Sequence, residues 1–441
     1  MQNNLNKLLS KIKNDKQIIL KLMQTAFTRA VSAFGTFVFN FVLARYLGAT
    51  ELGNFMIAYS LLIGLGFFAR FGLSSAIMRF AAIMYSEKQF GKIRKLRQDV
   101  FFISLVVTIV FGVFLVLFRD YISTVFFNSN KVSDILLVFA FALPFYSYQT
   151  IQSSFFKAYA KPQIAPFFEV GLTTFITGTS IAILAWFGMN INGVNASIVF
   201  FFASVIVALM GYIMLNRIVK KAQSGNEYQK ENYTGFFSSL PDYALSAFTG
   251  YLLKFSPTII LGLYASSKDV GLYSLANSTA FVVNFVLWIV STVYAPHFAN
   301  SYYKNEMNEL RRLVRNSTLY MMIIALPIFI VIVSFPTFIL GLFGEEFKEA
   351  KNALLIMAVA QLFNVATGPV YFLLNMTGHE KYLRNIVICT AIVSVLSSFL
   401  LSPYYGFMGA AISSALGLVL QNAIAFSVSK KYLGISFFNK E

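Results

Sequence analysis

The sequence contains very few of the residues on which thiol and metal chemistry depend. Its 441 residues include one cysteine, Cys389, and two histidines, His297 and His379. A single thiol excludes an intramolecular disulfide and any metal site built on several cysteines. The two histidines are far apart in the chain, and neither has a metal-type partner at short spacing. The sequence therefore carries no signature of a disulfide or a metal centre.

Enzyme motifs are missing as well. There is no glycine-rich loop of the Walker type, and none of the six aspartates forms an Asp-x-Asp pair, which weakens the case for a metal-dependent glycosyltransferase. Apart from the stretch 217–237, the predicted loops are short, so no soluble domain is available for a separate activity. We expect a protein without a catalytic site, a resident metal or a cofactor.

Charge is scarce, and apolar residues are abundant. Only 12% of the residues are charged and 57% are hydrophobic, whereas soluble proteins carry about 25% charged residues. The stretches 170–216 and 385–429 contain no charge, and each can hold two spans of roughly 20 residues. The other apolar blocks, read in the same way, predict an all-α polytopic membrane protein with about twelve transmembrane helices. These begin near residues 18, 52, 99, 132, 163, 194, 238, 270, 315, 350, 382 and 406.

The net charge of +17 is distributed unevenly along the chain. In the twelve-span topology, 24 of the 35 Lys and Arg residues fall on the side of the two termini. Such an excess marks the cytoplasmic side of a membrane protein, so both termini are predicted to be cytoplasmic. The basic character is thus explained by topology, and no nucleic-acid partner is expected. Six cations fall on the other side: Arg45, Arg119, Lys131, Lys268, Lys348 and Lys351.

The two halves of the chain resemble each other. When Tyr46 is aligned with Tyr264, the same offset aligns Gly53 with Gly271, and we call this pairing the repeat alignment. Because each half has six spans, both halves must have the same orientation, which predicts a parallel repeat with the working site between the halves. The predicted organisation is an amphipathic cytoplasmic segment lying on the membrane (1–17), a six-helix bundle (18–216), a cytoplasmic linker (217–237), a second six-helix bundle (238–429) and a cytoplasmic tail (430–441).

Polar residues recur at helical spacing in several apolar spans. Steps of three and four residues place side chains on one face of a helix, and lipid tails cannot satisfy polar groups. We therefore expect these faces to point inward, either lining a cavity or forming hydrogen bonds between helices. The stripes are Thr25, Arg29, Ser32, Thr36 and Asn40 in the first span, Asp242, Ser246, Gly250, Lys254 and Thr258 in the seventh, Asn277, Asn284, Trp288 and Ser291 in the eighth, and Gln361, Asn364, Tyr371 and Asn375 in the tenth.

Charged residues within the spans are the strongest candidates for a substrate site. Arg29, Arg70 and Lys254 would give a cavity a basic lining suited to an anionic solute, although Arg70 also lies close enough to a span end to reach water. Asp242 and Glu169 could couple transport to H⁺ or Na⁺, or could simply form salt bridges. Thr25, Ser32, Asn284 and Trp288 complete the predicted cavity, with Trp288 stacking on sugar rings or anchoring the membrane interface.

Several segments resemble a known family in their order and spacing. The run from Leu43 to Gly48, followed by Gly53-Asn54-Phe55 and the stretch from Gly72 to Phe80, resembles the opening of Wzx-type polysaccharide-biosynthesis flippases. The turn from Phe407 to Ala411 is similar to one that precedes the last span in these proteins. They belong to the multidrug/oligosaccharidyl-lipid/polysaccharide exporter superfamily, and the resemblance covers almost the whole chain.

This resemblance implies two six-helix bundles around a central cavity and transport by alternating access. The implied substrate is an undecaprenyl-pyrophosphate-linked oligosaccharide, moved to the outer leaflet of a bacterial inner membrane for O-antigen or similar surface polysaccharide. A polysaccharide polymerase and a chain-length regulator are the implied partners, beside the lipid bilayer. Two alternatives stay open: a multidrug or cation antiporter of the same superfamily, which would want acidic cavity residues, and a polymerase or ligase enzyme, which would want a larger external loop.

Overall fold

A computed structural model describes residues 2–222 and 235–434, and within these ranges it contains helices and turns but no β-strand. The first half of the chain forms α1 (Gln2–Arg70), α2 (Leu73–Ser86), α3 (Phe90–Tyr121), α4 (Asn130–Ala158), α5 (Leu172–Trp186) and α6 (Gly193–Ala222). The second half forms α7 (Leu240–Tyr264), α8 (Ser267–Tyr303), α9 (Met307–Ser334), α10 (Pro336–Gly341), α11 (Lys351–Ala366), α12 (Val370–Met376) and α13 (Glu380–Leu433).

Two of these helices, α1 and α13, are hairpins rather than straight rods. Each contains one non-helical glycine, Gly48 in α1 and Gly406 in α13. The rings of Phe39 and Phe55 lie 6.1 Å apart on either side of the first break, whereas a straight helix would separate them by about 24 Å. The chain therefore reverses at each glycine, and each helix consists of two antiparallel legs.

Nine helices within the described ranges are long and apolar enough to cross a membrane, or ten when a bent pair, Glu345–Ala366 with Val370–Met376, is taken as one span. The two hairpin helices, at 48 residues for Met23–Arg70 and 54 for Glu380–Leu433, offer two crossings each. The helices thus indicate a multi-pass membrane protein, and the count of twelve crossings stays a prediction with which their lengths are compatible.

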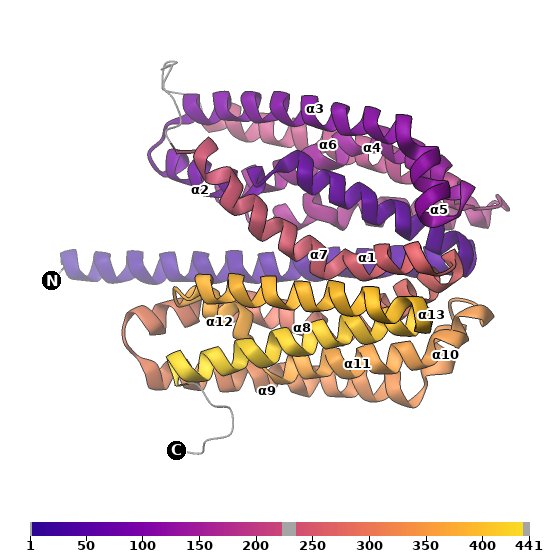
Figure 1. Cartoon of the computed structure of the whole chain (residues 1–441). Helices are drawn as coiled ribbons and strands as arrows, with labels where there is room; N and C mark the ends of the chain where they lie inside the picture. Colours follow the sequence, from indigo (N-terminus) through magenta and orange to yellow (C-terminus); the bar gives the residue numbers. More distant parts are fainter. Residues whose placement is uncertain (1, 223–234, 435–441) are drawn as a thin grey trace.

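The helices form two groups, one from each half of the chain (Figure 1). Helices α3 to α6 lie together in one group, α8, α9, α11 and α13 lie together in the other, and α1 and α7 run along the region where the groups meet. The start of α1, the end of α6 and the end of α13 lie at one end of the molecule, which we call the linker end. The turns within α1 and α13 lie at the opposite end, which we call the contact end.

The apolar core shows where the groups are joined. One large core at the contact end includes residues of both halves, among them Leu52, Phe55, Leu272 and Ala276. Towards the linker end this core divides: one cluster lies almost wholly in the first half, and another lies in the second half alone. Burial of apolar surface thus holds the halves together mainly at the contact end.

At the contact end, the backbones of the two halves approach each other closely. A Cβ atom built on Gly53 would lie 1.7 Å from the carbonyl oxygen of Ser267, and one built on Gly271 would lie 1.9 Å from the carbonyl oxygen of Ala49. The two contacts are reciprocal, because the repeat alignment relates Gly53 to Gly271 and Ala49 to Ser267. The second leg of α1 and the start of α8 therefore make equivalent contacts with each other.

The start of the chain differs from the expectation. The sequence predicts the segment 1–17 as a separate helix on the membrane surface, but the backbone of α1 is helical without interruption from Gln2 into the first leg. A helix collinear with a span cannot lie flat on the leaflet. The side chains of residues 2–22 lie outside the described part of the structure, as do residues 223–234 of the predicted linker and 435–441 of the tail.

Candidate functional site

Arg70 is the most unusual of the predicted site residues. It ends α1, directly before a break at Phe71 and Gly72, where φ is positive at both residues. Only 6% of Arg70 is exposed, and its guanidinium lies 5.1 Å from the ring centre of Phe67. Its Nη1 atom is buried without a hydrogen-bond partner among the described residues. The positive charge is thus deep inside the protein and only partly compensated.

A buried serine lies beside this guanidinium. A Cβ atom built on Gly66 would lie 3.2 Å from Arg70 Nη1 and 3.4 Å from Ser147 Oγ, so both atoms border the space left by this glycine. Within the described ranges, the Ser147 hydroxyl is also buried without a partner. An unsatisfied guanidinium N–H and an unsatisfied hydroxyl facing one small space are donors that an anionic oxygen could accept from.

Lys254 lies on α7 at the seam between the halves and is exposed. Its Nζ atom is 5.2 Å from the ring centre of Phe255, which lies 5.4 Å from the ring of Tyr251. The ring of Tyr251 in turn lies 5.6 Å from that of Phe67, and its hydroxyl donates a 3.0 Å hydrogen bond to the Ser60 carbonyl. One row of aromatic rings therefore connects Lys254 of the second half with Arg70 of the first.

Arg29 lies elsewhere, on the first leg of α1. The face that carries it packs against α5 and the π-helical turn before it (Phe167–Gly171): Ser32 touches Gly171, and the hydroxyls of Thr36 and Thr174 are 3.3 Å apart. Arg29 is half-buried, and its Nε atom is buried without a hydrogen-bond partner in the described part of the chain. Arg29 is thus directed towards the interior of the first group of helices, away from the aromatic row that connects Arg70 and Lys254.

The three predicted cations share one property. Among the residues that the structure describes, none of the carboxylates forms an ion pair with Arg29, Arg70 or Lys254. The ion pairs present instead join Arg119 to Asp120, Lys131 to Glu51, Lys157 to Glu169, Lys268 to Glu349, Arg312 to Glu309 and Lys348 to Glu345. Within the described residues, these three cations thus have no ionic partner.

Most of the uncharged candidates are engaged within their own group of helices. Asn284 is buried and accepts a 3.0 Å hydrogen bond from the side-chain amide of Asn364, so two of the predicted polar stripes meet each other. The Ser32 Oγ atom is buried without a partner among the described residues, and Thr25 is buried as well. Trp288 is 42% exposed and packs edge-on against Phe372. Of these candidates, Trp288 is the one that presents a large exposed surface.

The two predicted coupling carboxylates have different outcomes. Glu169, on the turn before α5, contacts the ammonium group of Lys157 at the end of α4, which favours the salt-bridge alternative over ion coupling. The side chain of Asp242 lies outside the described part of the structure, so its role in coupling stays a prediction.

Sequence reasoning missed the polar residues of α4. Ser147 and Gln149 are fully buried, and Gln149 accepts a 2.8 Å hydrogen bond from Thr173 while its own amide nitrogen has no partner within the described ranges. The run Tyr146-Ser147-Tyr148-Gln149 inside an apolar span was the available signal. Ser147 beside Arg70 and Gln149 against Thr173 extend the polar interior of the first half.

The chain has recognisable relatives. Residues 42–352 match the family model described as polysaccharide biosynthesis protein. The chain is 23% identical over 386 residues to the "Putative O-antigen transporter" of Shigella flexneri, covering 86% of this chain and 89% of that protein. It is 24% identical over 238 residues to the "Probable low-salt glycan biosynthesis flippase Agl15" of Haloferax volcanii, covering 53% of this chain and about half (48%) of that relative.

A solved structure shares the fold. The lipid II flippase MurJ in an inward closed conformation superposes with a TM-score of 0.72 at 16% identity, covering 93% of this chain and 87% of that one. At this identity the likeness shows a common architecture, not a common substrate. The family match, which spans well over half of the chain, agrees with the resemblance seen in the sequence. The chain therefore belongs to the polysaccharide biosynthesis protein family and has the same fold as the lipid II flippase.

Proposed function

We propose that this protein flips a polyprenyl-pyrophosphate-linked oligosaccharide from the cytoplasmic to the outer leaflet of the bacterial cytoplasmic membrane. The product would serve the assembly of O-antigen or a similar surface polysaccharide. The family match and the two named relatives, a glycan flippase and an O-antigen transporter, support this class of substrate. A polymerase and a chain-length regulator would then act on the flipped unit.

Arg70 is the observation that carries the proposal. An arginine keeps its charge at any physiological pH, and burying an unpaired charge costs several kcal/mol. No carboxylate within the described residues compensates Arg70, and its Nη1 donor is unsatisfied there. A pyrophosphate accepts hydrogen bonds from guanidinium groups in bidentate fashion, so it is the partner that this cation fits. Lys254, connected to it by the aromatic row, would contact the same substrate from the second half.

The arrangement of the halves supports access from the linker end. The halves share one core at the contact end but have separate cores towards the linker end, which the charge distribution predicts to be cytoplasmic. A lipid-linked substrate would enter from that side. Separation of the contact end and closure of the linker end would then complete alternating access, as expected for parallel repeats that rock against each other.

The proposal is tested in cells that depend on this gene for a surface polysaccharide. Deletion should leave the lipid-linked repeat unit on the cytoplasmic leaflet and abolish the surface polymer. Arg70→Gln should fail to restore the polymer, whereas Arg70→Lys should restore part of it because the charge is kept. Arg94→Gln, at an exposed position of α3, is the control and should restore it fully. Normal polymer from Arg70→Gln at equal protein level would refute the role of Arg70.

A further inference from the structure

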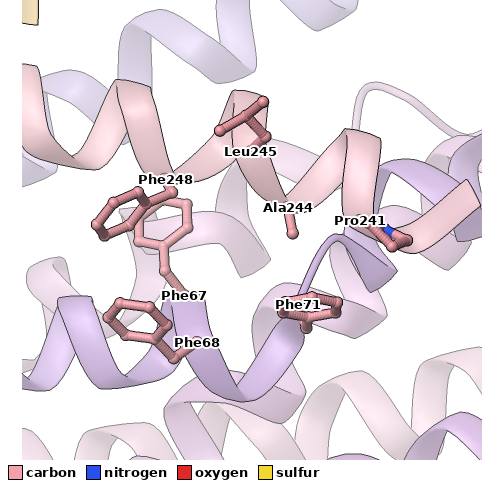
Figure 2. Close-up of a pocket in the computed structure, with 7 residues that line it drawn as sticks. All are labelled: Phe67, Phe68, Phe71, Pro241, Ala244, Leu245 and Phe248. Carbon is pink, nitrogen blue, oxygen red and sulfur yellow. The ribbon is translucent and has the colours of Figure 1, made fainter. Parts of the chain in front are cut away.

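An apolar pocket lies where the two halves of the chain meet, near the linker end. It measures about 250 Å³ and is lined by residues of α1 and its end on one side and of α7 on the other (Figure 2). Phe67, Phe68 and Phe71 on the α1 side lie opposite Phe248, Ala244 and Pro241 of α7. The full lining is Phe67, Phe68, Phe71, Pro241, Ala244, Leu245 and Phe248.

Part of this lining is exposed, although Phe67 and Phe248 pack against the large core. Phe68, Phe71 and Leu245 are 46%, 50% and 50% exposed, so their side chains stand open along the groove. The rings of Phe68 and Phe248 lie 5.2 Å apart and tilted, which joins the two walls at one end. All seven lining residues are apolar, so the groove favours a hydrocarbon occupant over a sugar or a peptide, whose polar groups would lose their hydrogen bonds to water there.

Cations lie next to the groove. Arg70 belongs to the same helix end as Phe67 and Phe71, and its guanidinium lies 5.1 Å from the Phe67 ring. On the other side, Arg79 of α2 donates a 3.3 Å hydrogen bond to the hydroxyl of Tyr243, the neighbour of Ala244 in α7. The groove thus combines a hydrocarbon surface with adjacent positive charge, the pattern that a lipid phosphate complements.

We propose that this groove between α1 and α7 binds a section of the polyprenyl chain of the lipid carrier while its phosphate group lies towards Arg70. This inference rests on the proposed function and adds the site that would recognise the lipid part of the substrate. A volume of about 250 Å³ is below that of a drug-sized pocket, so only a few isoprene units fit, and the rest of the chain stays in the bilayer. Branched, unsaturated isoprene units pack well against four phenylalanine rings.

The position of the groove gives it a role in transport. Because its walls come from different halves, movement of the halves against each other would change its shape. The chain would then be held when the linker end is open and released when that end closes. Binding of the chain would favour the conformation in which the groove is formed, since a ligand shifts an equilibrium towards the state it binds.

Photocrosslinking tests the site directly in the full-length protein in lipid nanodiscs. p-Benzoylphenylalanine in place of Phe68 should form an adduct with the mass of added undecaprenyl phosphate. The same photoprobe in place of Phe141, a 60% exposed residue of α4, is the matched control for contact with bulk lipid. An adduct yield at position 68 that does not exceed the yield at position 141 would overturn the inference.

Two variants test the groove itself. Ala244→Trp should fill it, and Phe248→Ala, combined with Leu245→Ala, should widen it. Each variant should lower the yield of the undecaprenyl phosphate adduct at position 68 by about tenfold or more. The reason is that each changes the apolar contact area available to the lipid by the area of one or two large side chains. Unchanged yields in both variants, with a monodisperse elution profile that shows folding, would contradict the proposal. So would an adduct with phosphatidylglycerol that undecaprenyl phosphate does not displace.

The same variants separate this inference from the proposed function. If the wild-type protein crosslinks undecaprenyl phosphate at position 68 but does not flip the lipid-linked oligosaccharide in vesicles, the groove stands and the proposed function fails. If the wild type flips it and Ala244→Trp flips it at the same rate, the groove inference fails and the function stands.

Discussion

The carboxylate of Glu346, from the second half of the chain, accepts a 2.7 Å hydrogen bond from the backbone amide of Ala49 in the first half. Ala49 follows the break at Gly48, where φ is 73° and ψ is 174°, and it starts the second leg of α1. A Cβ atom at position 48 would lie 2.7 Å from the same carboxylate oxygen. Glu346 thus caps a helix of the opposite half and helps to hold the contact end closed.

Replacing Glu346 tests this hydrogen bond between the two halves. Glu346→Ala leaves the amide of Ala49, a buried residue, without its acceptor, which costs about 1–3 kcal/mol. We expect a lower midpoint of thermal unfolding for the purified protein and faster hydrogen exchange at the start of the second leg of α1. Glu345→Ala is the control, because this neighbouring glutamate pairs with Lys348 in solvent and should have little effect. Equal stability of the two variants would argue against a stabilising role of the hydrogen bond from Ala49 to Glu346.

The close approach of the repeated glycines gives a second prediction. Gly53→Ala and Gly271→Ala each insert a methyl group against a backbone carbonyl oxygen that cannot move aside cheaply. Overpacking of this kind costs about 1–3 kcal/mol, so both variants should unfold at lower temperature. Gly250→Ala in α7 has nothing within 4 Å of the added Cβ, and it should stabilise the protein by up to about 1 kcal/mol through helix propensity. If all three variants changed the unfolding temperature in the same way, the reciprocal contact of Gly53 and Gly271 would be contradicted.

Each half of the chain places an ion pair at the contact end. Lys131 pairs with Glu51, and the repeat alignment matches Lys131 with Glu349, which pairs with Lys268. Their surroundings differ, because Glu51 also accepts a 2.9 Å hydrogen bond from the Gly193 amide and its side chain is 16% exposed, against 54% for Glu349.

Glu51→Gln should therefore destabilise the protein more than Glu349→Gln. We expect a loss of about 1–3 kcal/mol for the first and less than about 1 kcal/mol for the second, since exposed ion pairs contribute little. Denaturant unfolding of the two variants in the same detergent measures the difference. A larger effect of Glu349→Gln would show that the exposed pair is the one that matters.

The predicted topology can be measured with single cysteines. Cys389→Ser removes the only thiol, and cysteine is then placed at Asn190 or at Asn305, two exposed positions at opposite ends of the molecule. A membrane-impermeant maleimide applied to intact cells should label position 190 and leave position 305 unlabelled until the cells are permeabilised. Labelling of position 305 alone would reverse the predicted orientation.

The architecture was more predictable from the sequence than the site. Long uncharged stretches and the repeat alignment indicated the membrane helices and the paired glycines, because apolar length and repetition are visible along one chain. They did not reveal that Gly53 and Gly271 pack against each other's helix, since equivalence in a repeat does not specify contact. The breaks at Gly48 in α1 and Gly406 in α13, by contrast, lie close to residues 52 and 406, where the sequence predicts new spans to begin.

Among the site residues, periodicity identified inward faces but not their partners. Asn284 meets Asn364 and Glu169 meets Lys157 through the packing of different helices, which spacing within one helix cannot encode. The burial of Arg70 beside Ser147 of α4 likewise depends on packing between helices, which spacing along α1 cannot encode. The apolar groove was not predicted, because its two walls come from opposite halves of the chain.

Transport by the purified protein tests the proposed function most directly. Vesicles containing only this protein are loaded with a polyprenyl-pyrophosphate-linked oligosaccharide, and the fraction that a membrane-impermeant glycosidase can reach is followed over time. Wild-type protein should exchange the lipid between leaflets, and Arg70→Gln should reduce the rate strongly at equal incorporation. Exchange no faster than in protein-free vesicles, under an imposed H⁺ or Na⁺ gradient as well as without one, would contradict the proposed flippase function.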